Sequence, residues 1–192
     1  MSLQNAFLGS LVADAVSMPV HWYYNRGAID QDYGDFATYC RPRNPHPDSI
    51  LWRSEFRPKN PKADILGNQL KYWGRRGIHY HQFLEAGDNT LNLQLAAELY
   101  RNSILLGGFD PETWLKRYVE VMLTPGWHQD TYAEEYHRAF FDNYSSRKPL
   151  LSCGISDYHI GGLSLIPALL ASMEALDLND SSVQLEKVLN LE

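Results

Sequence analysis

Residues 88–111 read DNTLNLQLAAELYRNSILLGGFDP, and this stretch decides the fold class. Leucines at positions 91, 93 and 95 alternate with polar residues, a spacing that also fits a β-strand. The following Ala96-Ala97-Glu98-Leu99 favours a helix, because these residue types have high helix propensity. Asp88 or Asn89 can cap this helix, and Gly107-Gly108 ends it. The stretch therefore predicts a helix from about residue 90 to residue 106.

The same reasoning predicts helices on both sides of this one. Asp110 is a good N-cap and Pro111 suits the first helical position, so a second helix begins there and Thr124-Pro125-Gly126 ends it. Three further predicted helices are Asn5 to Ser17, Gly162 to Leu176, and Asp180 to Leu191. Another begins at a cap formed by Asp130, and its apolar stripe consists of Tyr132, Ala133, Tyr136, Phe140 and Tyr144. We find no convincing strand pair, so the sequence predicts an all-α helical bundle.

The composition is that of a folded protein. The chain has 192 residues, 44% of them hydrophobic, which suits one compact domain over residues 1–192 and excludes a disordered protein. The net charge of −6 argues against wholesale coating of nucleic acid. Two cysteines, Cys40 and Cys153, exclude a disulfide scaffold and are interpreted as reduced thiols. No membrane span or signal peptide is predicted, so the expected compartment is the cytoplasm.

Positive charge is concentrated between Arg41 and Arg76, which carries nine Lys and Arg residues against three Asp and Glu residues. Half of all the prolines lie in the first part of this stretch, so residues 41–61 are predicted to be an irregular surface segment. Such a basic arm could bind phosphate or nucleic acid. The interpretation that we favour is a solvated loop that balances an acidic body.

A first candidate cluster is the stretch from Gly9 to His21, GSLVADAVSMPVH. An aspartate inside an apolar helix is costly to bury unless it is paired or binds a metal, which makes Asp14 informative. It could equally face a loop or accept a backbone N–H. His21 follows Pro19 just beyond the helix, where it could face a cleft or be a hydrogen-bonded core residue.

A second candidate cluster is Gly87-Asp88-Asn89-Thr90, at the start of the predicted helix. A helix start supplies free N–H groups and the positive end of the helix dipole. Carboxylate, amide and hydroxyl oxygens together suit a hard cation such as Mg²⁺, but the same residue types are the usual N-caps.

A third candidate cluster is Ser156 to Gly162, SDYHIGG, before another predicted helix. Two glycines let the backbone approach a ligand closely, and a helix start can hold a phosphate. Asp157 and His159 could orient a ribose or act as acid and base. A glycine-containing turn followed by an N-cap explains the same pattern.

Taken together, the three clusters resemble the ADP-ribosylglycohydrolase family, which includes dinitrogenase reductase-activating glycohydrolases and the J-class crystallins. Ala13-Asp14-Ala15 stands where the family has G-D-A, Gly87-Asp88-Asn89-Thr90 where it has a T-D-D-T-like motif, and Tyr158 to Pro167 where it has a glycine-rich turn and a helix with an internal proline. The order and approximate spacing of the motifs agree over nearly the whole chain.

The resemblance implies an all-α fold, Mg²⁺ as cofactor and hydrolysis of the bond that joins ADP-ribose to a protein side chain. ADP-ribose or an ADP-ribosylated protein would then be the partner. Carried over to this sequence, Asp88 and His21 would be catalytic, and Asp88, Asn89 and Thr90 would be metal ligands. The ligand-binding residues would be Asp14, Asp157, Tyr158, His159, Gly161 and Gly162.

Three departures from the family pattern bear on activity. Gly87 and Asn89 replace residues of the metal motif, His21 stands where a Glu is expected, and the chain ends before the family's G-D-x-D-T-like segment. Two Mg²⁺ ions need several anionic oxygens, and Asp88 with Asp14 supplies only two carboxylates. We therefore predict a C-terminally short member with weak or absent catalysis, closest to the crystallin-like branch. The alternative is a non-catalytic structural protein of the crystallin type.

Overall fold

The structure, a computed structural model, describes residues 2–35 and 37–189. These residues form α-helices, short 3-10 turns and irregular segments, and no β-strand occurs among them, which confirms the all-α class. The α-helices are α1 (Leu3–Ser17), α2 (Arg26–Tyr33), α3 (Leu91–Leu106), α4 (Pro111–Leu123), α5 (Glu135–Ser145), α6 (Ile166–Ala175) and α7 (Ser181–Leu189). No described helix has both the length and the apolar character needed to span a bilayer. Cys40 and Cys153 are free thiols, as predicted.

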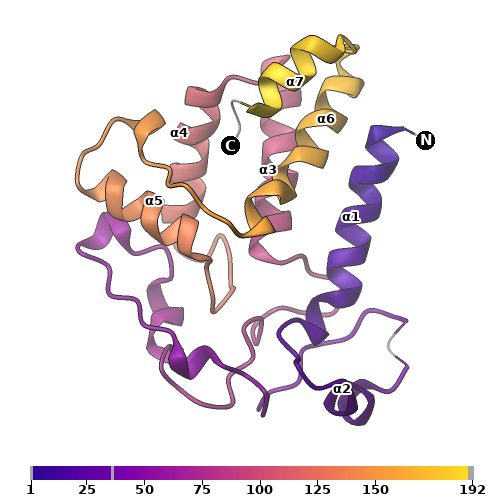
Figure 1. Cartoon of the computed structure of the whole chain (residues 1–192), viewed down its shortest axis with the longest axis vertical. Helices are drawn as coiled ribbons and strands as arrows, with labels where there is room; N and C mark the ends of the chain where they lie inside the picture. Colours follow the sequence, from indigo (N-terminus) through magenta and orange to yellow (C-terminus); the bar gives the residue numbers. More distant parts are fainter. Residues whose placement is uncertain (1, 36, 190–192) are drawn as a thin grey trace.

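Helix α6 packs between α1 and α3 (Figure 1). The contact is made by Phe7 of α1, Ala96 of α3, and Ala168 and Ala171 of α6, all buried. Small side chains at such a contact let the helix backbones approach closely. Glu174 at the far end of α6 adds a polar link, because its two carboxylate oxygens accept the N–H groups of Leu3 (3.1 Å) and Gln4 (2.9 Å). The first turn of α1 is thereby capped from α6.

The larger core joins α3, α4, α5 and α6. Of the apolar stripe predicted for α4, Trp114, Tyr118, Val119 and Met122 are buried, and of the stripe predicted for α5, Phe140 is buried within the helix. Leu95 and Leu99 of α3 and Leu169 of α6 fill the space between them. Full burial of a leucine or phenylalanine side chain contributes about 1.5–3 kcal/mol each, so this cluster is the main apolar contribution to stability.

Several helix boundaries follow the sequence prediction. Asp110 Oδ1 accepts the N–H of Thr113 at 2.8 Å, and Pro111 is the first residue of α4. Gly107 ends α3 with a left-handed backbone (φ +70°), a conformation that side chains disfavour. Asp180 Oδ1 accepts the N–H of Ser182 at 2.8 Å at the start of α7. The predicted end of that helix at Leu191 lies outside the described residues.

Other boundaries were predicted wrongly. Thr90, and neither Asp88 nor Asn89, occupies the N-cap position of α3. Asp130 does not cap α5, which begins at Glu135 after Glu134. The helix expected from Gly162 is a 3-10 turn over Ile160–Leu165 and becomes α-helical only at Ile166. The two glycines disfavour regular helix there, since each has a high conformational entropy.

The described residues between α2 and α3 contain 3-10 turns and irregular backbone but no α-helix. Residues 41–61, predicted to be an irregular surface segment, contain irregular backbone and 3-10 turns, but His46 and Leu51 within them are fully buried, and backbone without α-helix continues to Thr90. Irregular backbone leaves carbonyl groups without helical partners, and buried histidines supply donors to some of them. His79 Nε2 donates to the carbonyl of Pro19 (3.0 Å), and His128 Nε2 donates to that of Ile65 (2.7 Å). Imidazole rings thus replace part of the missing secondary structure.

Candidate functional site

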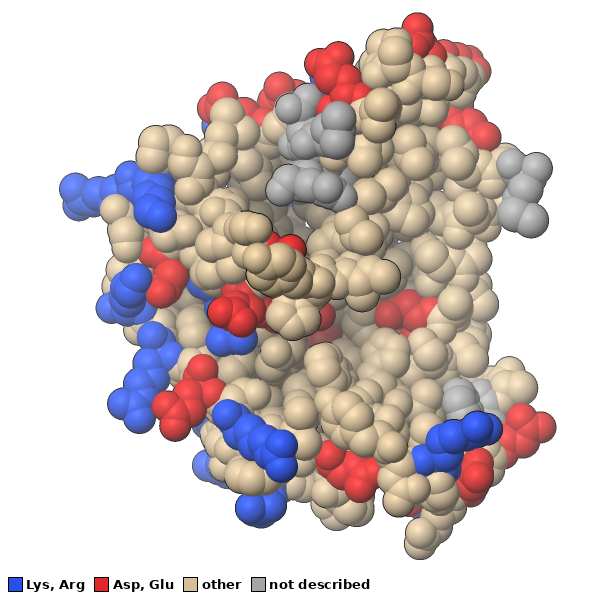
Figure 2. All heavy atoms as spheres, viewed as in Figure 1, with Lys and Arg blue, Asp and Glu red and all other residues tan. Residues whose placement is uncertain are grey.

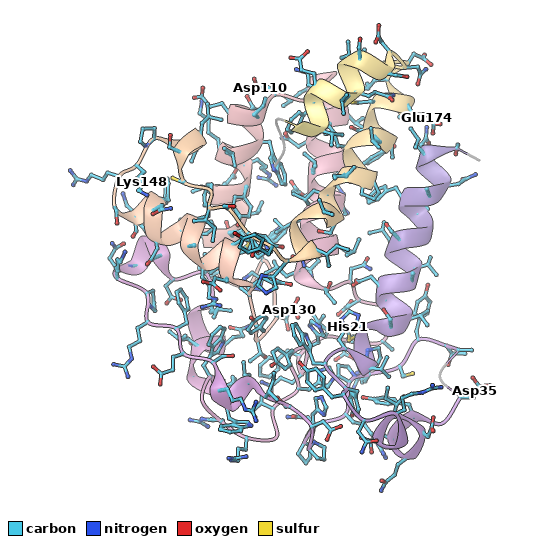
Figure 3. All side chains as sticks on the ribbon, viewed as in Figure 1. His21, Asp35, Asp110, Asp130, Lys148 and Glu174 are labelled. Carbon is cyan, nitrogen blue, oxygen red and sulfur yellow. The ribbon has the colours of Figure 1, made fainter. Side chains whose placement is uncertain are left out.

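A polar cavity of about 340 Å³ lies at the N-terminal end of α3. Segments that are far apart in the sequence contribute to its wall. Figure 3 places two of the lining residues, His21 and Asp130, close together and above α2 in this view. The lining residues are Asp14, His21, Trp22, His81, Thr90, Leu91, Asn92, Leu93, Asp130, Tyr132, Glu134 and Ser164. Three carboxylates and two imidazoles therefore line one cavity.

Asp14 joins the first two sequence motifs. Its Oδ1 accepts the hydroxyl of Thr90 at 2.8 Å, and its Oδ2 accepts the backbone N–H of Thr90 at 2.8 Å and the side-chain amide of Asn89 at 2.9 Å. The half-buried carboxylate of Asp14, in a mostly apolar helix, is thus paired, which offsets the cost of its partial desolvation. The amide of Asn89 also donates to the carbonyl of Leu11 at 2.7 Å.

Asp130 is fully buried and caps α3, although it lies 39 residues after Leu91 in the sequence. One carboxylate oxygen accepts the N–H of Leu91, and the other accepts a hydrogen bond from His81 Nδ1. A negative charge is favourable at this end of a helix. Burial alone would lower the pKa of His81, but the charge of Asp130 and the hydrogen bond to it outweigh burial and raise that pKa. The carboxylate of Asp130 therefore favours the imidazolium form of His81.

His21 continues this chain of hydrogen bonds toward α1. Its Nδ1 lies 3.1 Å from His81 Nε2, and its Nε2 lies 3.1 Å from the hydroxyl oxygen of Ser17. Burial and the neighbouring charge of His81 lower the pKa of His21 to about 4, so its ring is neutral at neutral pH. A protonated His81 donates to Nδ1 of His21, which fixes the tautomer that donates from Nε2 to Ser17. Each ring nitrogen in the chain then has a partner.

Glu134 is the third carboxylate of the polar cavity. Its Oε1 accepts the side-chain amide of Asn92 at 2.8 Å. Burial raises the pKa of Glu134. A carboxyl group with a raised pKa that faces a cavity is suited to give or take a proton.

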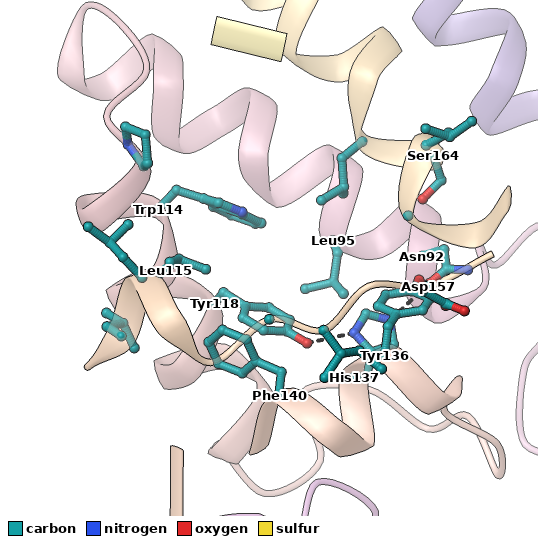
Figure 4. Close-up of a pocket in the computed structure, with 18 of the residues that line it drawn as sticks. Asn92, Leu95, Trp114, Leu115, Tyr118, Tyr136, His137, Phe140, Asp157 and Ser164 are labelled. Carbon is teal, nitrogen blue, oxygen red and sulfur yellow. Dashed lines mark hydrogen bonds between the residues drawn. The ribbon is translucent and has the colours of Figure 1, made fainter. Parts of the chain in front are cut away.

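A second cavity of about 350 Å³, mainly apolar, adjoins the first, and Asn92 and Ser164 line both. Trp114, Tyr118 and Phe140 form much of its wall (Figure 4). At its inner end the Tyr118 hydroxyl donates to His137 Nδ1 at 2.6 Å, and His137 Nε2 donates to Asn92 Oδ1 at 3.1 Å. Burial lowers the pKa of His137 to about 3, so this ring is neutral.

The third sequence motif borders the apolar cavity. Asp157 and Gly162 line it, and Asp157 Oδ1 accepts a hydrogen bond from His159 Nδ1 at 2.6 Å. That hydrogen bond raises the pKa of His159 and lowers that of Asp157. The other oxygen of Asp157, Oδ2, is buried without a hydrogen-bond partner among the described residues. Tyr158 points into solvent and is 99% exposed.

Gly161 approaches a protein side chain closely. A Cβ atom there would lie 3.1 Å from Cε1 of Tyr136 and 3.3 Å from its hydroxyl oxygen. Tyr136 in turn donates to Asn92 Oδ1 at 2.8 Å. The glycine therefore lets the third motif pack against Tyr136 and Asn92, beside both cavities.

Asp88 is placed apart from these groups. It is exposed, its Oδ2 accepts the N–H of Glu85 at 2.8 Å, and it is not among the described residues that line the polar cavity. Of the predicted residues, the structure brings Asp14, His21 and Thr90 to the polar cavity and Asp157, His159 and Gly162 to the apolar one. The catalytic and metal-binding roles of Asp88 stay predictions.

The donor set does not fit a magnesium ion. Within residues 2–35 and 37–189, no three side chains of His, Cys, Asp or Glu are grouped so that they could hold a metal. The oxygens of Asp14 accept hydrogen bonds from Thr90 and Asn89, and Asn89 directs its amide nitrogen, which is no ligand, toward Asp14. A hard cation needs several free oxygens.

The sequence did not indicate His81, Asn92, Asp130 or Glu134 as members of one site. Asp130 looked like a helix cap, and Asn92 and Glu134 are ordinary polar residues near helix starts. The one available signal was the alternation His79-Tyr80-His81, since histidines in an apolar setting require partners.

Comparisons of the chain with protein-family models, with curated proteins and with solved structures gave no match. Function is therefore inferred from the residues and their geometry.

Proposed function

We propose that the chain is an ADP-ribosylglycohydrolase-like protein that binds an ADP-ribosyl group across the two adjoining cavities, with weak or absent hydrolysis. The observation that carries the proposal is the convergence of the three motifs. Asp14 of the first motif accepts hydrogen bonds from Asn89 and Thr90 of the second. The third approaches Asn92, two residues beyond the second, through Gly161.

The two cavities offer different chemistry to the two ends of such a ligand. Each lies in the size range of small-molecule sites, and they share two lining residues. The aromatic wall of Trp114, Tyr118 and Phe140 suits a purine ring. The buried Oδ2 of Asp157 can accept an amino group of that ring.

The polar cavity suits the distal ribose. Sugar hydroxyls can donate to the carboxylates of Asp14 and Glu134, which line it together with His21. A phosphate group does not suit this cavity, because three carboxylates would repel it. The diphosphate would therefore lie nearer His159, whose pKa is raised.

The donor chemistry of the described residues supports the proposal of weak or absent hydrolysis. The family resemblance implies a Mg²⁺-dependent reaction, and the described residues do not present a donor set for that ion. Glu134 is the group best placed to move a proton, because its pKa is raised and it faces the polar cavity. Proton transfer by one positioned group accelerates a reaction by only about 10²–10⁴-fold.

The test is a set of melting curves with and without ADP-ribose, each with and without Mg²⁺. A ligand that binds the folded state alone stabilises it by about 2.7 kcal/mol at a hundredfold excess over its dissociation constant. We expect ADP-ribose to raise the melting temperature to the same extent with and without Mg²⁺. Incubation with an ADP-ribosylated protein should release little or no ADP-ribose.

A matched pair of variants locates the binding. Asp157→Asn should reduce the shift caused by ADP-ribose, because Asn at this position replaces a free carboxylate oxygen of the apolar cavity. Asp35→Asn makes the same chemical change on an exposed residue that Figure 3 places at the edge of the molecule, and should leave the shift unchanged. Absence of a shift in a cooperatively melting protein, or equal effects of the two substitutions, would contradict the proposal.

One observation favours the second candidate, a non-catalytic structural protein. The carboxylates of Asp14 and Asp130 bind the first N–H groups of α3 and so already have a structural task. A protein of that kind would melt cooperatively and show no response to ADP-ribose under any of the four conditions.

A further inference from the structure

Four cations of the segment without α-helices lie over two aromatic rings. The guanidinium groups of Arg53 and Arg76 lie 4.9 and 3.9 Å from the ring centroid of Trp52. The ammonium of Lys71 and the guanidinium of Arg75 lie 5.2 and 5.9 Å from that of Tyr72. Such contacts are attractive and restrict the long side chains, so less entropy is lost when a ligand binds them. We call these six residues the basic–aromatic surface.

This surface is continuous and reachable from solvent. Arg75 and Arg76 are consecutive, so one peptide bond joins the Tyr72 group to the Trp52 group. All four cations are exposed and both rings are half-buried. The side chain of Phe83 is 37% exposed, and its ring centroid lies 5.4 Å from that of Tyr72, so Phe83 adds a third aromatic ring beside the surface. Several Lys and Arg side chains lie at the lower-left edge of the molecule in Figure 2, over the purple and magenta segment of Figure 1.

The positive charge of the surface is not balanced by ion pairs. Among the described residues, no carboxylate lies within ion-pair distance of Arg53, Lys71, Arg75 or Arg76. Arg41, Arg43 and Lys59, from the same part of the chain, all pair with carboxylates. The four cations are thus available to an anionic partner, although the protein as a whole carries a net charge of −6.

The combination of planar groups and charge selects among anionic partners. Arginine guanidinium planes and aromatic rings stack on nucleobases, and the same arginines bind phosphates. Only unpaired bases are free to stack in this way. An acidic peptide has no planar rings at regular spacing and would use the charge alone. We propose that the basic–aromatic surface binds single-stranded nucleic acid, a chemistry shared by RNA and DNA and independent of the function proposed for the cavities.

The sequence allowed two interpretations of this segment, a solvated loop and an arm that binds phosphate or nucleic acid, and the structure favours the second. A solvated loop was the favoured interpretation of its charge from the sequence. A solvated loop would leave its arginines unpartnered, whereas here three arginines and a lysine are held over two rings. That arrangement is the reason to expect a partner.

The test is fluorescence anisotropy of labelled oligouridylate and oligothymidylate of about a dozen nucleotides, titrated with the full chain at several salt concentrations. We expect both to bind, with a logarithmic salt slope of about −0.7 for each phosphate that the protein neutralises. Arg75→Gln/Arg76→Gln should reduce the magnitude of that slope by about 1.4 and weaken binding at least tenfold at low salt. Arg147→Gln/Lys148→Gln removes the same charge from exposed residues near the end of α5 and should bind as the unchanged protein does.

A conservative pair separates stacking from charge. Arg75→Lys/Arg76→Lys keeps the charge and should keep the salt slope, but it should weaken binding at least about fivefold because the planar groups are removed. The proposal is overturned by any of three results: no binding at low salt, equal losses in the two Gln pairs, or competition by polyglutamate as strong as that by unlabelled oligonucleotide. The last result would assign the surface to acidic proteins. Circular dichroism of each variant checks that it is folded.

Discussion

Replacement of His79 by Gln tests the cost of keeping neutral histidines inside this fold. His79 is fully buried, its Nε2 donates to Pro19 O at 3.0 Å, and its Nδ1 accepts the N–H of His81 at 3.0 Å. The hydrogen bond at Nδ1 requires the neutral ring, because a protonated ring cannot accept there, whereas Nε2 can donate to Pro19 in either form. Burial, and after it the charge of His81, lowers the pKa of His79 to about 3.

The sign of the effect follows from proton binding. In the unfolded chain His79 titrates near its ordinary value of about 6.5, whereas in the folded protein it stays neutral down to about pH 3. The unfolded state therefore binds the proton first, and stability is lost as the pH falls from about 6.5 toward 3, by about 1.36 kcal/mol per pH unit. At about pH 5 the loss from His79 alone is about 2 kcal/mol. That is a large part of the 5–15 kcal/mol by which proteins of this kind are usually stable.

The assay is urea unfolding at several pH values between about 5 and 7.5. Gln can still donate to the carbonyl of Pro19 but does not titrate. We therefore expect His79→Gln to be less stable than the unchanged protein near neutral pH and to lose less stability on acidification, by about 2 kcal/mol at about pH 5. His21 and His137, whose pKa values are also lowered, act equally in both proteins and cancel in the comparison. So does His81, whose raised pKa acts with the opposite sign.

His159→Gln is the matched control. His159 is exposed, and its hydrogen bond to Asp157 raises its pKa, so its removal cannot make the acid loss shallower. Parallel curves for His79→Gln and the unchanged protein between about pH 7 and pH 5 would show that His79 is protonated without cost, and the effect assigned to its burial would be refuted.

Further substitutions test one ion pair, one close packing contact and one helix cap. Asp130→Asn leaves the His81 imidazolium buried without its carboxylate, and urea unfolding at neutral pH should show a loss of about 3–5 kcal/mol; a loss below about 1 kcal/mol would contradict the ion pair. Gly161→Ala places a methyl group 3.1 Å from Tyr136, so the ring must move and the loss should be about 1–3 kcal/mol, whereas Gly162→Ala has nothing within 4 Å and should differ little from the unchanged protein. Asp110→Ala should lower the melting temperature and Asp110→Ser should restore most of the loss, because a side-chain oxygen is all that Thr113 N–H requires; equal melting temperatures of the two variants would refute this.

The sequence predicted those parts of the fold whose signals are local. The junction of α3 and α4 is the clearest case, since Gly107, Asp110 and Pro111 lie within five positions of one another and each acts on its own neighbours. Asp130 has the same residue type and also stands before a helical stripe. It nevertheless caps α3, 39 residues upstream, because the folded chain brings it there. A cap that acts across the fold cannot be distinguished by sequence from one that acts on the next turn.

The sequence predicted the candidate site only in part, because most of its contacts also join residues that are far apart in the chain. The energetic cost of an aspartate within an apolar helix indicated that Asp14 has a partner, and the structure supplies Thr90 and Asn89. Asn92, which faces both cavities, was not identified, because one asparagine in a helix carries no such cost. Asp88 was chosen for its type and spacing, but its side chain accepts the N–H of Glu85 on its own loop.

The start of α3 constrains how a phosphate-bearing ligand could lie in the proposed site. From the sequence this end was expected to offer free N–H groups to an anion. In the structure Asp14 binds the N–H of Thr90 and Asp130 binds that of Leu91, so two carboxylates already occupy the positive end of the helix dipole. A diphosphate would be repelled there and attracted to His159, whose raised pKa leaves it more readily charged, at the border of the apolar cavity. In the proposed complex the two carboxylates would thus orient the ligand by exclusion, with its uncharged sugar toward α1 and its anionic part away from α3.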